Sequence, residues 1–556
     1  MHSFGEHRTG ALFDPFGFLD LRRRQILDQG WAGTFRTKVL LFLPVHRVAA
    51  ELNAVHGRPT KDLYIMLGTL ILQQMHDMTD AAAVEAVAFN IAWQYALDIG
   101  SSEDAYVSER TIRNYRALVI EHGLDQVLFR TLTDHLMEVY KVDATHQRID
   151  STALQSAMRK LSRLGVFTET IERFLRKLSQ KFPDDYRRLD EVIRVRYLDG
   201  GKGMCFGAGS KPSEAARHLD QAAEDLLDLI ERFAGTPAAQ LPGYKLMRRV
   251  LDEQCEVKPD GGRKVVLKEK ADGRSLQNPS DPDSTYNAHK GQGYTMQVME
   301  TYVPDEPATL PGPDADATTT PADDSQQPQA QEPEQPLPPK PDLITFVAVN
   351  GMPDYDGKAL VPAIEETAAR GIAPEDLLGD THYGTGNNPQ AAAEHGVELI
   401  SPAQPPKGSL QGNLQLEDFG IDDDGLVVTC PAGRKPISLS VSPSGKNYQA
   451  RFDSDACANC SLRPTCPVQD PRPSDPKACR VQYDRPRLDM YRRRLGEKKP
   501  EFQQRYRWRA GIEATMSRLK HVLGMGALRV RGLTAVTYEA FLGALSLNIM
   551  RCAAAR

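Results

Sequence analysis

The stretch that decides the fold is residues 376–401, DLLGDTHYGTGNNPQAAAEHGVELIS. It starts with a short apolar strand that ends at Asp380, passes through a turn rich in glycine and asparagine and a short helix, and finishes on a second strand at 397–401. A helix is expected over 360–369, just before it. Because strands alternate with helices here, the pattern predicts an α/β unit with a mixed sheet.

Three stretches on the N-terminal side also have strand character, namely 147–154 (QRIDSTAL), 293–298 (GYTMQV) and 343–349 (LITFVAV). The first of them contains Asp150. A carboxylate at the end of a buried strand has a fixed position at the rim of a sheet, so Asp150 and Asp380 could meet at one metal-binding position. Aspartate at a strand end is also common in turns, so neither residue identifies a site by itself.

Residues 36–140 are expected to be mostly helical. Apolar residues recur at helical spacing over 63–75, a second helix is expected over 81–97, and a third begins at Ser108, a residue type that favours helix N-termini. The third helix has one apolar face and another that carries Arg110, Arg113 and Arg116. Such a helix suits docking against a DNA duplex, and an ordinary amphipathic surface helix fits the same pattern equally well.

Three segments interrupt the α/β pattern. Residues 157–275 return to helical periodicity and are interpreted as a helical insertion. Residues 304–341 hold eleven prolines and eight acidic residues against Lys340 alone, a composition that cannot bury enough apolar surface to fold, so they are predicted to be a disordered acidic linker. Residues 404–485 are rich in turns and cysteines and are expected to form a β insertion. The predicted organisation is a tail at 1–35, a helical DNA-binding domain at 36–140, the first part of an α/β core at 141–403, the cysteine-rich β insertion at 404–485 and the closing helices of the core at 486–556.

The bulk composition is that of a globular protein with several domains, with 556 residues of which 40% are hydrophobic and 26% charged. We expect no membrane span and a cytoplasmic location, because there is no run of 18 or more apolar residues and no apolar signal core near Met1. The net charge of −6 is unusual for a nucleic-acid-binding protein, but residues 491–535 hold twelve basic residues and three glutamates. DNA phosphates respond to such a local basic surface, which a solvated basic helix would also explain.

The helix expected near the C-terminus carries four polar side chains at regular spacing: Tyr506, Arg509, Glu513 and Lys520. At about 100° per residue, all four fall on one narrow face of a continuous helix. A face with a hydroxyl, a guanidinium, a carboxylate and an ammonium group suits a metal ligand beside phosphate-binding cations. An ordinary ion-pair stripe is the equal alternative, because Arg509 and Glu513 are four residues apart.

These four side chains fit the signature Y-x2-R-x3-E-x6-K, and through it the chain resembles one large group of bacterial insertion-sequence DDE transposases. Residues 379–384 (GDTHYG) resemble the segment around the second catalytic aspartate of that family, and residues 148–152 (RIDST) resemble the segment around the first. Residues 57–123 resemble its N-terminal domain. The resemblance implies an RNase H-like catalytic domain, in which the first carboxylate lies on the first strand, the second after the fourth strand and the third on a later helix.

The resemblance also implies a mechanism and partners. Asp150, Asp380 and Glu513 would hold two Mg²⁺ or Mn²⁺ ions, which prefer hard oxygen ligands. Cleavage at a transposon end would free a 3′-hydroxyl that attacks target DNA, and the signature tyrosine, arginine and lysine would hold the transposon-end strand near the scissile phosphate. The implied partners are inverted-repeat DNA and target DNA, and a homodimer on DNA is expected because joining two ends needs two active sites.

Two other functions remain open at this point. One is a catalytically silent DNA-binding protein derived from a transposase, and the acidic triad argues against it. The other is a host nuclease with an RNase H-like fold, and the Tyr-Arg-Glu-Lys pattern argues against that.

Four of the eight cysteines form a group in the β insertion: Cys430, Cys457, Cys460 and Cys466. Four thiolates, two of them in a C-x2-C pair, are the ligand set of a structural zinc site. The alternative is a group of reduced thiols that pack the small insertion, and Cys479 could replace one of the ligands. The lack of a secretion signal argues against a disulfide framework.

Overall fold

The computed structural model describes residues 14–52, 60–199, 212–257, 265–304, 340–406 and 411–555. The chain divides into two compact units. The first unit comprises Met1–Asp143, Asp150–Tyr355 and Ile512–Arg556, and the second comprises Ala144–Ile149 and Asp356–Gly511. Each unit is therefore built from segments that are far apart in the sequence.

The first unit begins with a run of helices. Their bounds are α1 (Leu21–Gln29), α2 (Trp31–Thr34), η1 (Phe35–Val39), η2 (Leu40–Phe42), α3 (Val45–Ala50), α4 (Leu63–Met75), α5 (Asp80–Phe89), α6 (Ile91–Ala96), α7 (Glu109–Glu121) and α8 (Leu124–Tyr140). The predicted helical N-terminal region is thus confirmed. Helix α4 begins where the Asp62 side chain accepts a hydrogen bond from the Ile65 N–H, at 3.0 Å, and almost all of its residues are buried.

The helix expected over 81–97 is instead two helices. The break falls at Asn90, whose backbone is extended and whose side chain accepts hydrogen bonds from the N–H groups of Ala92 and Trp93. Asparagine favours such a cap, because its side-chain oxygen satisfies the N–H groups that a new helix leaves open. The predicted start of α7 at Ser108 is confirmed, with the Ser108 hydroxyl accepting from the Thr111 N–H at 3.2 Å.

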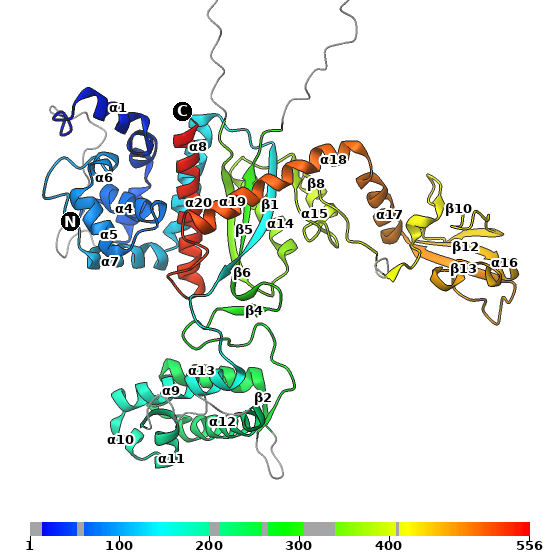
Figure 1. The fold of residues 1–556 in the computed structure, drawn as a ribbon, viewed down its shortest axis with the longest axis horizontal. Helices are drawn as coiled ribbons and strands as arrows, with labels where there is room; N and C mark the ends of the chain where they lie inside the picture. The colour runs from blue at the N-terminus through cyan, green and yellow to red at the C-terminus, as the bar shows by residue number, and fades with distance from the viewer. Residues whose placement is uncertain are drawn as a thin grey trace, which may run out of the picture. The chain divides into compact units, whose positions relative to one another are not determined.

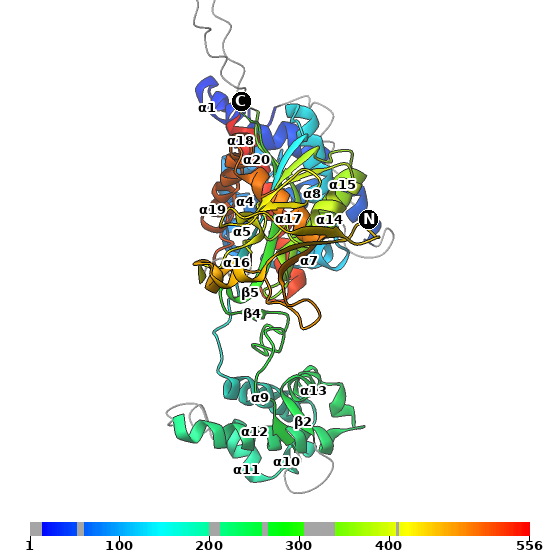
Figure 2. The same ribbon diagram turned by 90° about the vertical axis from the view of Figure 1, so that its right-hand side faces the viewer.

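Residues between β1 and β4 form the predicted helical insertion. Its elements are α9 (Arg163–Lys181), α10 (Pro183–Arg187), α11 (Glu191–Arg194), η3 (Val195–Asp199), α12 (Pro212–Phe233), η4 (Pro237–Gln240), α13 (Pro242–Gln254) and the small hairpin of β2 (Cys255–Val257) and β3 (Val265–Leu267). Figure 2 shows α9, α12 and α13 gathered around one another. They enclose an apolar core that includes Phe174 on α9 and Phe233 on α12, whose ring centroids are 5.4 Å apart.

A mixed sheet is the centre of the α/β part, as predicted. Its strands are β1 (His146–Gln155), β4 (Thr285–Asn287), β5 (Gly291–Thr301), β6 (Ile344–Gly351), β7 (Asp376–Leu378) and β8 (Glu398–Ile400). In the first unit, β5 pairs antiparallel with β4 and β6. In the second unit, the start of β1 pairs parallel with β7, and β7 pairs parallel with β8. Strand β1 belongs to both units, because the division between them falls at Asp150.

Most of the acidic segment between β5 and β6 lies outside the described residues, so its predicted disorder stays a prediction. After the second unit, the chain returns to the first through α19 (Gly511–His521) and α20 (Leu533–Ala554). In the described part of the chain, α20 is the one helix long and apolar enough to cross a membrane. Its most apolar stretch of 18 residues is 67% buried inside the protein. Its packing against α4, α8 and β6 accounts for this apolar character (Figure 1).

The second unit adds helices and a cysteine-rich β region to its strands. The helical segments are η5 (Asp356–Ala359), α14 (Leu360–Ala369), α15 (Asn388–Glu394), η7 (Leu416–Asp418), α16 (Ser454–Ala458), η8 (Arg463–Thr465), α17 (Arg485–Glu497), α18 (Pro500–Tyr506) and η9 (Arg507–Ala510). The remaining strands are β9 (Gly420–Ile421), β10 (Val427–Thr429), β11 (Ser438–Val441), β12 (Asn447–Asp453) and β13 (Ala478–Asp484). Strands β11, β12 and β13 form an antiparallel sheet with β12 in the middle.

The single continuous helix assumed for residues 506–520 is wrong. Helix α18 ends at Tyr506, a 3₁₀ segment occupies Arg507–Ala510, and α19 begins at Gly511. A 3₁₀ segment advances by about 120° per residue instead of 100°, so the angular positions of the four signature residues change across it. The argument that all four share one narrow helical face therefore does not hold.

Candidate active site

The prediction that Asp150 ends a strand is wrong, because β1 continues to Gln155. Asp150 lies in the middle of β1, directly after the buried residues 147–149. Its side chain is half-buried, and its Oδ1 accepts a hydrogen bond from the Ser151 N–H at 2.8 Å. Because a backbone N–H holds the carboxylate, the direction of the Asp150 side chain depends on the path of the strand.

Asp380 follows β7, whose Leu377 and Leu378 are fully buried. Its Oδ1 accepts from the His382 N–H at 2.8 Å, and its carbonyl oxygen accepts from the Ser401 hydroxyl at 2.6 Å. The carboxylate and the carbonyl of this half-buried residue are thus both held in place. The turn that follows β7 therefore presents Asp380 at a defined position.

Close packing explains the residue types of this turn. Tyr383 is fully buried, and a Cβ on Gly379 would lie only 2.9 Å from the Tyr383 Cβ. A Cβ on Gly384 would collide with the Arg493 guanidinium and the Ser401 hydroxyl. Arg493 donates to the carbonyl oxygens of Gly384 and Ser401, which fastens the turn to α17 within the second unit. Both glycines are needed for this close approach, and not only for flexibility.

Within the second unit, two arginines fix the segment that carries Tyr506 and Arg509. Arg148 on β1 is buried and donates to the Trp508 carbonyl at 2.8 Å. Arg505 forms two hydrogen bonds to the Glu398 carboxylate, at 2.9 and 2.7 Å. The Arg505 guanidinium lowers the pKa of Glu398 below its usual value. The half-buried Tyr506 stacks on Phe502, with ring centroids 5.4 Å apart.

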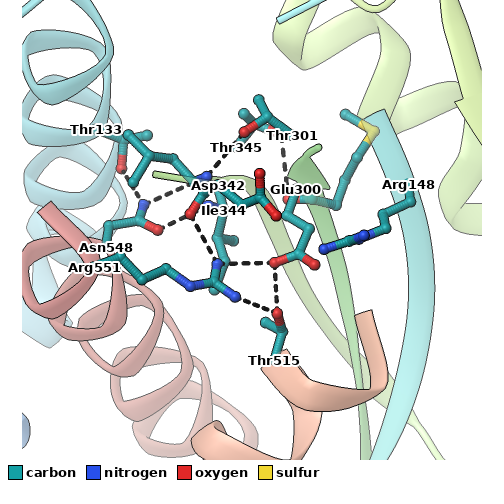
Figure 3. A network of polar contacts seen from close by, with 12 residues as sticks. Thr133, Arg148, Glu300, Thr301, Asp342, Ile344, Thr345, Thr515, Asn548 and Arg551 are labelled. Carbon is teal, nitrogen blue, oxygen red and sulfur yellow. Dashed lines mark hydrogen bonds and ion pairs between the residues drawn. The ribbon is translucent and has the colours of Figure 1, made fainter. Parts of the chain in front are cut away.

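In the first unit, a buried ionic network holds α19, the helix that carries Glu513. Figure 3 shows Glu300 of β5 between Thr515 of α19 and Arg551 of α20. Glu300 is fully buried, and its Oε2 accepts from the Thr515 hydroxyl at 2.6 Å and from Arg551 Nη1 at 2.9 Å. Arg551 also donates to the Thr515 hydroxyl. A buried carboxylate needs such paired and hydrogen-bonded partners, so this network determines where α19 lies against β5.

Glu513 itself is exposed, two residues before Thr515, and Lys520 is half-buried near the end of α19. Asp150 and Glu513 belong to the first unit, and Asp380 belongs to the second. The described residues contain no group of three or more His, Cys, Asp or Glu side chains already arranged to hold a metal ion. The predicted convergence of the three carboxylates therefore stays a prediction. Their chemistry fits Mg²⁺ or Mn²⁺, because each would offer hard carboxylate oxygens.

The three arginines of α7 have different surroundings. Arg110 and Arg113 are exposed. Arg116 is half-buried, forms an ion pair with Asp80 and donates to the Gln73 side chain at 2.8 Å. Partial burial of Asp80 opposes ionisation, but the hydrogen bond and charge of Arg116 help to lower the pKa of Asp80 below its usual value. Arg116 thus has a structural role between α7 and α5, and a role for the three arginines in binding DNA stays a prediction.

The four grouped cysteines surround one cavity in the second unit, with a volume of about 150 Å³: Cys430, Cys457, Cys460 and Cys466. These four cysteines form no disulfide, and they are half-buried. Burial and the neighbouring Cys479 raise the pKa of Cys457 to about 11.

The sequence did not point to the residues that position the site, namely Arg148, Glu300, Thr515 and Arg551. The one available signal was a charged residue inside an apolar strand, as Glu300 is after Val298 and Met299. A buried charge in such a strand requires a partner, but the sequence does not say which one.

Comparison with known protein families gives two matches. Residues 429–553 match the family described as "Transposase DDE domain". Residues 31–118 match the family described as "Transposase domain (DUF772)". No curated protein and no solved structure matches the chain. The first match spans most of the cysteine-rich region, the signature residues and nearly all of α20, and the second spans the helices from α2 to most of α7. The chain therefore carries a transposase DDE domain and, near its N-terminus, a transposase domain of the DUF772 type.

Proposed function

We propose that this protein is the transposase of an insertion sequence, which cleaves DNA at the transposon ends and joins them to target DNA. Asp150, Asp380 and Glu513 are the proposed ligands of two Mg²⁺ or Mn²⁺ ions. The transposase matches support DNA as the substrate. The alternation of strands and helices from β1 to α19 supports an RNase H-like core, because β7 follows β1, β5 and β6 in the sheet when the short strand β4 is left aside.

The register of β1 against β7 is the observation that carries this proposal. His146 pairs with Asp376, and Arg148 pairs with Leu378, in a parallel arrangement. Asp150 comes two residues after Arg148 on β1, and Asp380 comes two residues after Leu378, beyond the end of β7. If the chain continues the same register to these positions, both carboxylates face one side of the sheet. The proposal requires this relation of the two carboxylates.

The protein's own groups would contribute positioning and charge. When bound, the metal ions supply activation of water and stabilisation of the leaving oxygen. The Ser151 and His382 N–H groups orient the two aspartates. Tyr506, Arg509 and Lys520 are proposed to hold the phosphates of the transposon-end strand, since guanidinium and ammonium groups bind phosphate oxygens. A homodimer on DNA would provide one site for each of two ends.

The test uses the purified full-length protein, Mg²⁺ and labelled DNA that carries the terminal inverted repeats flanking the gene. We expect a nick that exposes a 3′-hydroxyl at the repeat. Asp150→Ala, Asp380→Ala and Glu513→Ala should each slow cleavage roughly a thousandfold, as expected for losing about 4 kcal/mol of metal-assisted stabilisation. Asp184→Ala, an exposed carboxylate on α10, is the matched control and should cleave normally.

Two results would overturn the proposal. Cleavage that persists in any of the three variants would show that the removed carboxylate is not a ligand. Specific binding to the repeats without cleavage by the unmodified protein would instead favour a catalytically silent derivative, and cleavage of DNA without preference for the repeats would favour a host nuclease.

A further inference from the structure

We propose that Cys430, Cys457, Cys460 and Cys466 bind one structural zinc ion in the second unit. This metal would be separate from the proposed catalytic ions, and the inference does not depend on transposase activity. It rests on the arrangement of three backbone turns, on a cavity between four thiols and on the charges that surround it.

The three later cysteines lie in one short segment that runs from the end of α16 through consecutive turns to the residue after η8. The Cys460 N–H donates to the Cys457 carbonyl at 3.2 Å, and the Arg463 N–H donates to the Cys460 carbonyl at 3.0 Å. The Cys466 N–H then donates to the Arg463 carbonyl at 3.2 Å. Each bond closes a turn of the backbone, and these turns bring Cys457, Cys460 and Cys466 to the lining of one cavity.

The fourth thiol comes from a different loop. Cys430 follows β10 and begins a tight turn in which the Gly433 N–H donates to the Cys430 carbonyl at 2.8 Å. Gly433 has a φ of +76°, which glycine adopts without strain. The same loop is tied to α16 by a hydrogen bond from Arg434 to the Ala456 carbonyl. Two loops that are distant in sequence thus meet at the cavity.

The four cysteines and eleven other residues line one cavity of about 150 Å³. This cavity leaves room beside the thiols for an ion, which a close-packed core would not. The thiols are not already in a chelating arrangement, so binding would require side-chain rotation to bring the sulfurs about 2.3 Å from the ion.

The charges around the cavity fit a bound zinc ion. Four thiolates and one Zn²⁺ carry a net charge of about −2, which is costly to bury without nearby cations. Arg434, Lys435 and Arg463 line the same cavity, against Asp453 alone among acidic side chains in its lining. Arg463 also forms an ion pair with Asp470, and Arg434 donates to the Ala456 carbonyl, so both have structural partners as well. Their charges would still offset part of the negative charge of a zinc–tetrathiolate group.

The experiment measures metal bound by the full-length protein, purified under reducing conditions and dialysed without chelator. Elemental analysis should give about one zinc per chain, and Cys460→Ser should retain less than about a fifth of it, because each thiolate contributes to affinity. Cys255→Ala is the matched control. Cys255 is a buried cysteine of the helical insertion and does not line the cavity, so this variant should retain zinc.

A second measurement covers the case in which a serine variant fails to fold. The unmodified protein is exchanged into Co²⁺, and thiolate-to-cobalt charge-transfer bands together with the intense visible bands of tetrahedral cobalt are expected. The proposal is overturned if the unmodified protein holds no zinc and shows no such bands, or if Cys255→Ala loses as much zinc as Cys460→Ser. Four freely reactive thiols in the metal-loaded protein would equally contradict it.

Discussion

The two insertions of this chain are stabilised in different ways. Among the described residues, the helical insertion between β1 and β4 has a core of 26 buried residues, whereas the core of the cysteine-rich region has 12. The helical core includes several large aromatic and aliphatic side chains. In the cysteine-rich region, three of the grouped cysteines, Cys430, Cys457 and Cys466, pack against this core and are only partly buried.

The difference shows how a small region can fold without a large apolar core. A small structure buries too little apolar surface to offset its conformational entropy, and bound metal is one common remedy. Helices α9, α12 and α13 bury enough surface against one another to need no such remedy. We therefore expect the helical insertion to depend on packing and the cysteine-rich region to depend on zinc.

The largest expected effect is that of removing zinc. A strong zinc chelator should make amide hydrogen exchange in β11, β12 and β13 at least ~100-fold faster, because structural zinc contributes its binding free energy to folding. Exchange in α9, α12 and α13 should not change. Mass spectrometry of peptides from both regions in one sample makes this comparison, and equal protection of the sheet with and without zinc would contradict it.

A core substitution in the helical insertion should accelerate amide exchange in that insertion and leave the cysteine-rich region unchanged. Phe174→Ala removes a fully buried ring that packs near Phe233 and Tyr244, and such a change costs about 3–5 kcal/mol. Amide exchange in α9 and α13 should accelerate accordingly, while zinc content stays the same. Lys177→Ala, on the exposed side of α9, is the control. Unchanged exchange in α9 would show that this core does not stabilise the insertion.

The smallest effect concerns the polar contact inside the cysteine-rich core. The Tyr483 hydroxyl donates to the Gly425 carbonyl at 2.6 Å, and Tyr483→Phe removes this bond at a cost of about 1 kcal/mol. Zinc binding should be unchanged, since Tyr483 does not line the cavity. Hydrogen exchange of β13 provides the measurement. If Tyr483→Phe reduced the exchange protection of β13 as much as chelation does, packing and not the metal would dominate the stability of this region as well.

Local sequence patterns predicted most of the secondary structure. Helix α14 begins and ends where the pattern placed it, at Leu360 and Ala369, and the apolar periodicity of 63–75 gave the bounds of α4. The errors arose where a local cap or a change of helix type decided the outcome. Asn90 began a new helix instead of continuing one, and Arg507–Ala510 formed a 3₁₀ segment. Periodicity alone does not reveal such changes.

The candidate site could be predicted only in part. The position of Asp380 after an apolar strand was visible in the sequence, and β7 confirms that strand. The contacts that fix neighbouring elements were not visible, because they join distant residues. Arg148 contacts the carbonyl of a residue 360 positions away, and Glu300 contacts one 251 positions away. No local pattern specifies such partners, and the convergence of the three carboxylates remains a prediction.

The late position of α20 in the chain affects how the protein is made. This helix packs against α4, α8 and β6, all of which leave the ribosome well over a hundred residues earlier. Until translation reaches Leu533, the apolar surfaces of these elements lack the partner that covers them, and such exposure favours aggregation. A nascent chain halted before that point would therefore be a substrate for chaperones and proteases, so the cell would accumulate only full-length protein in folded form.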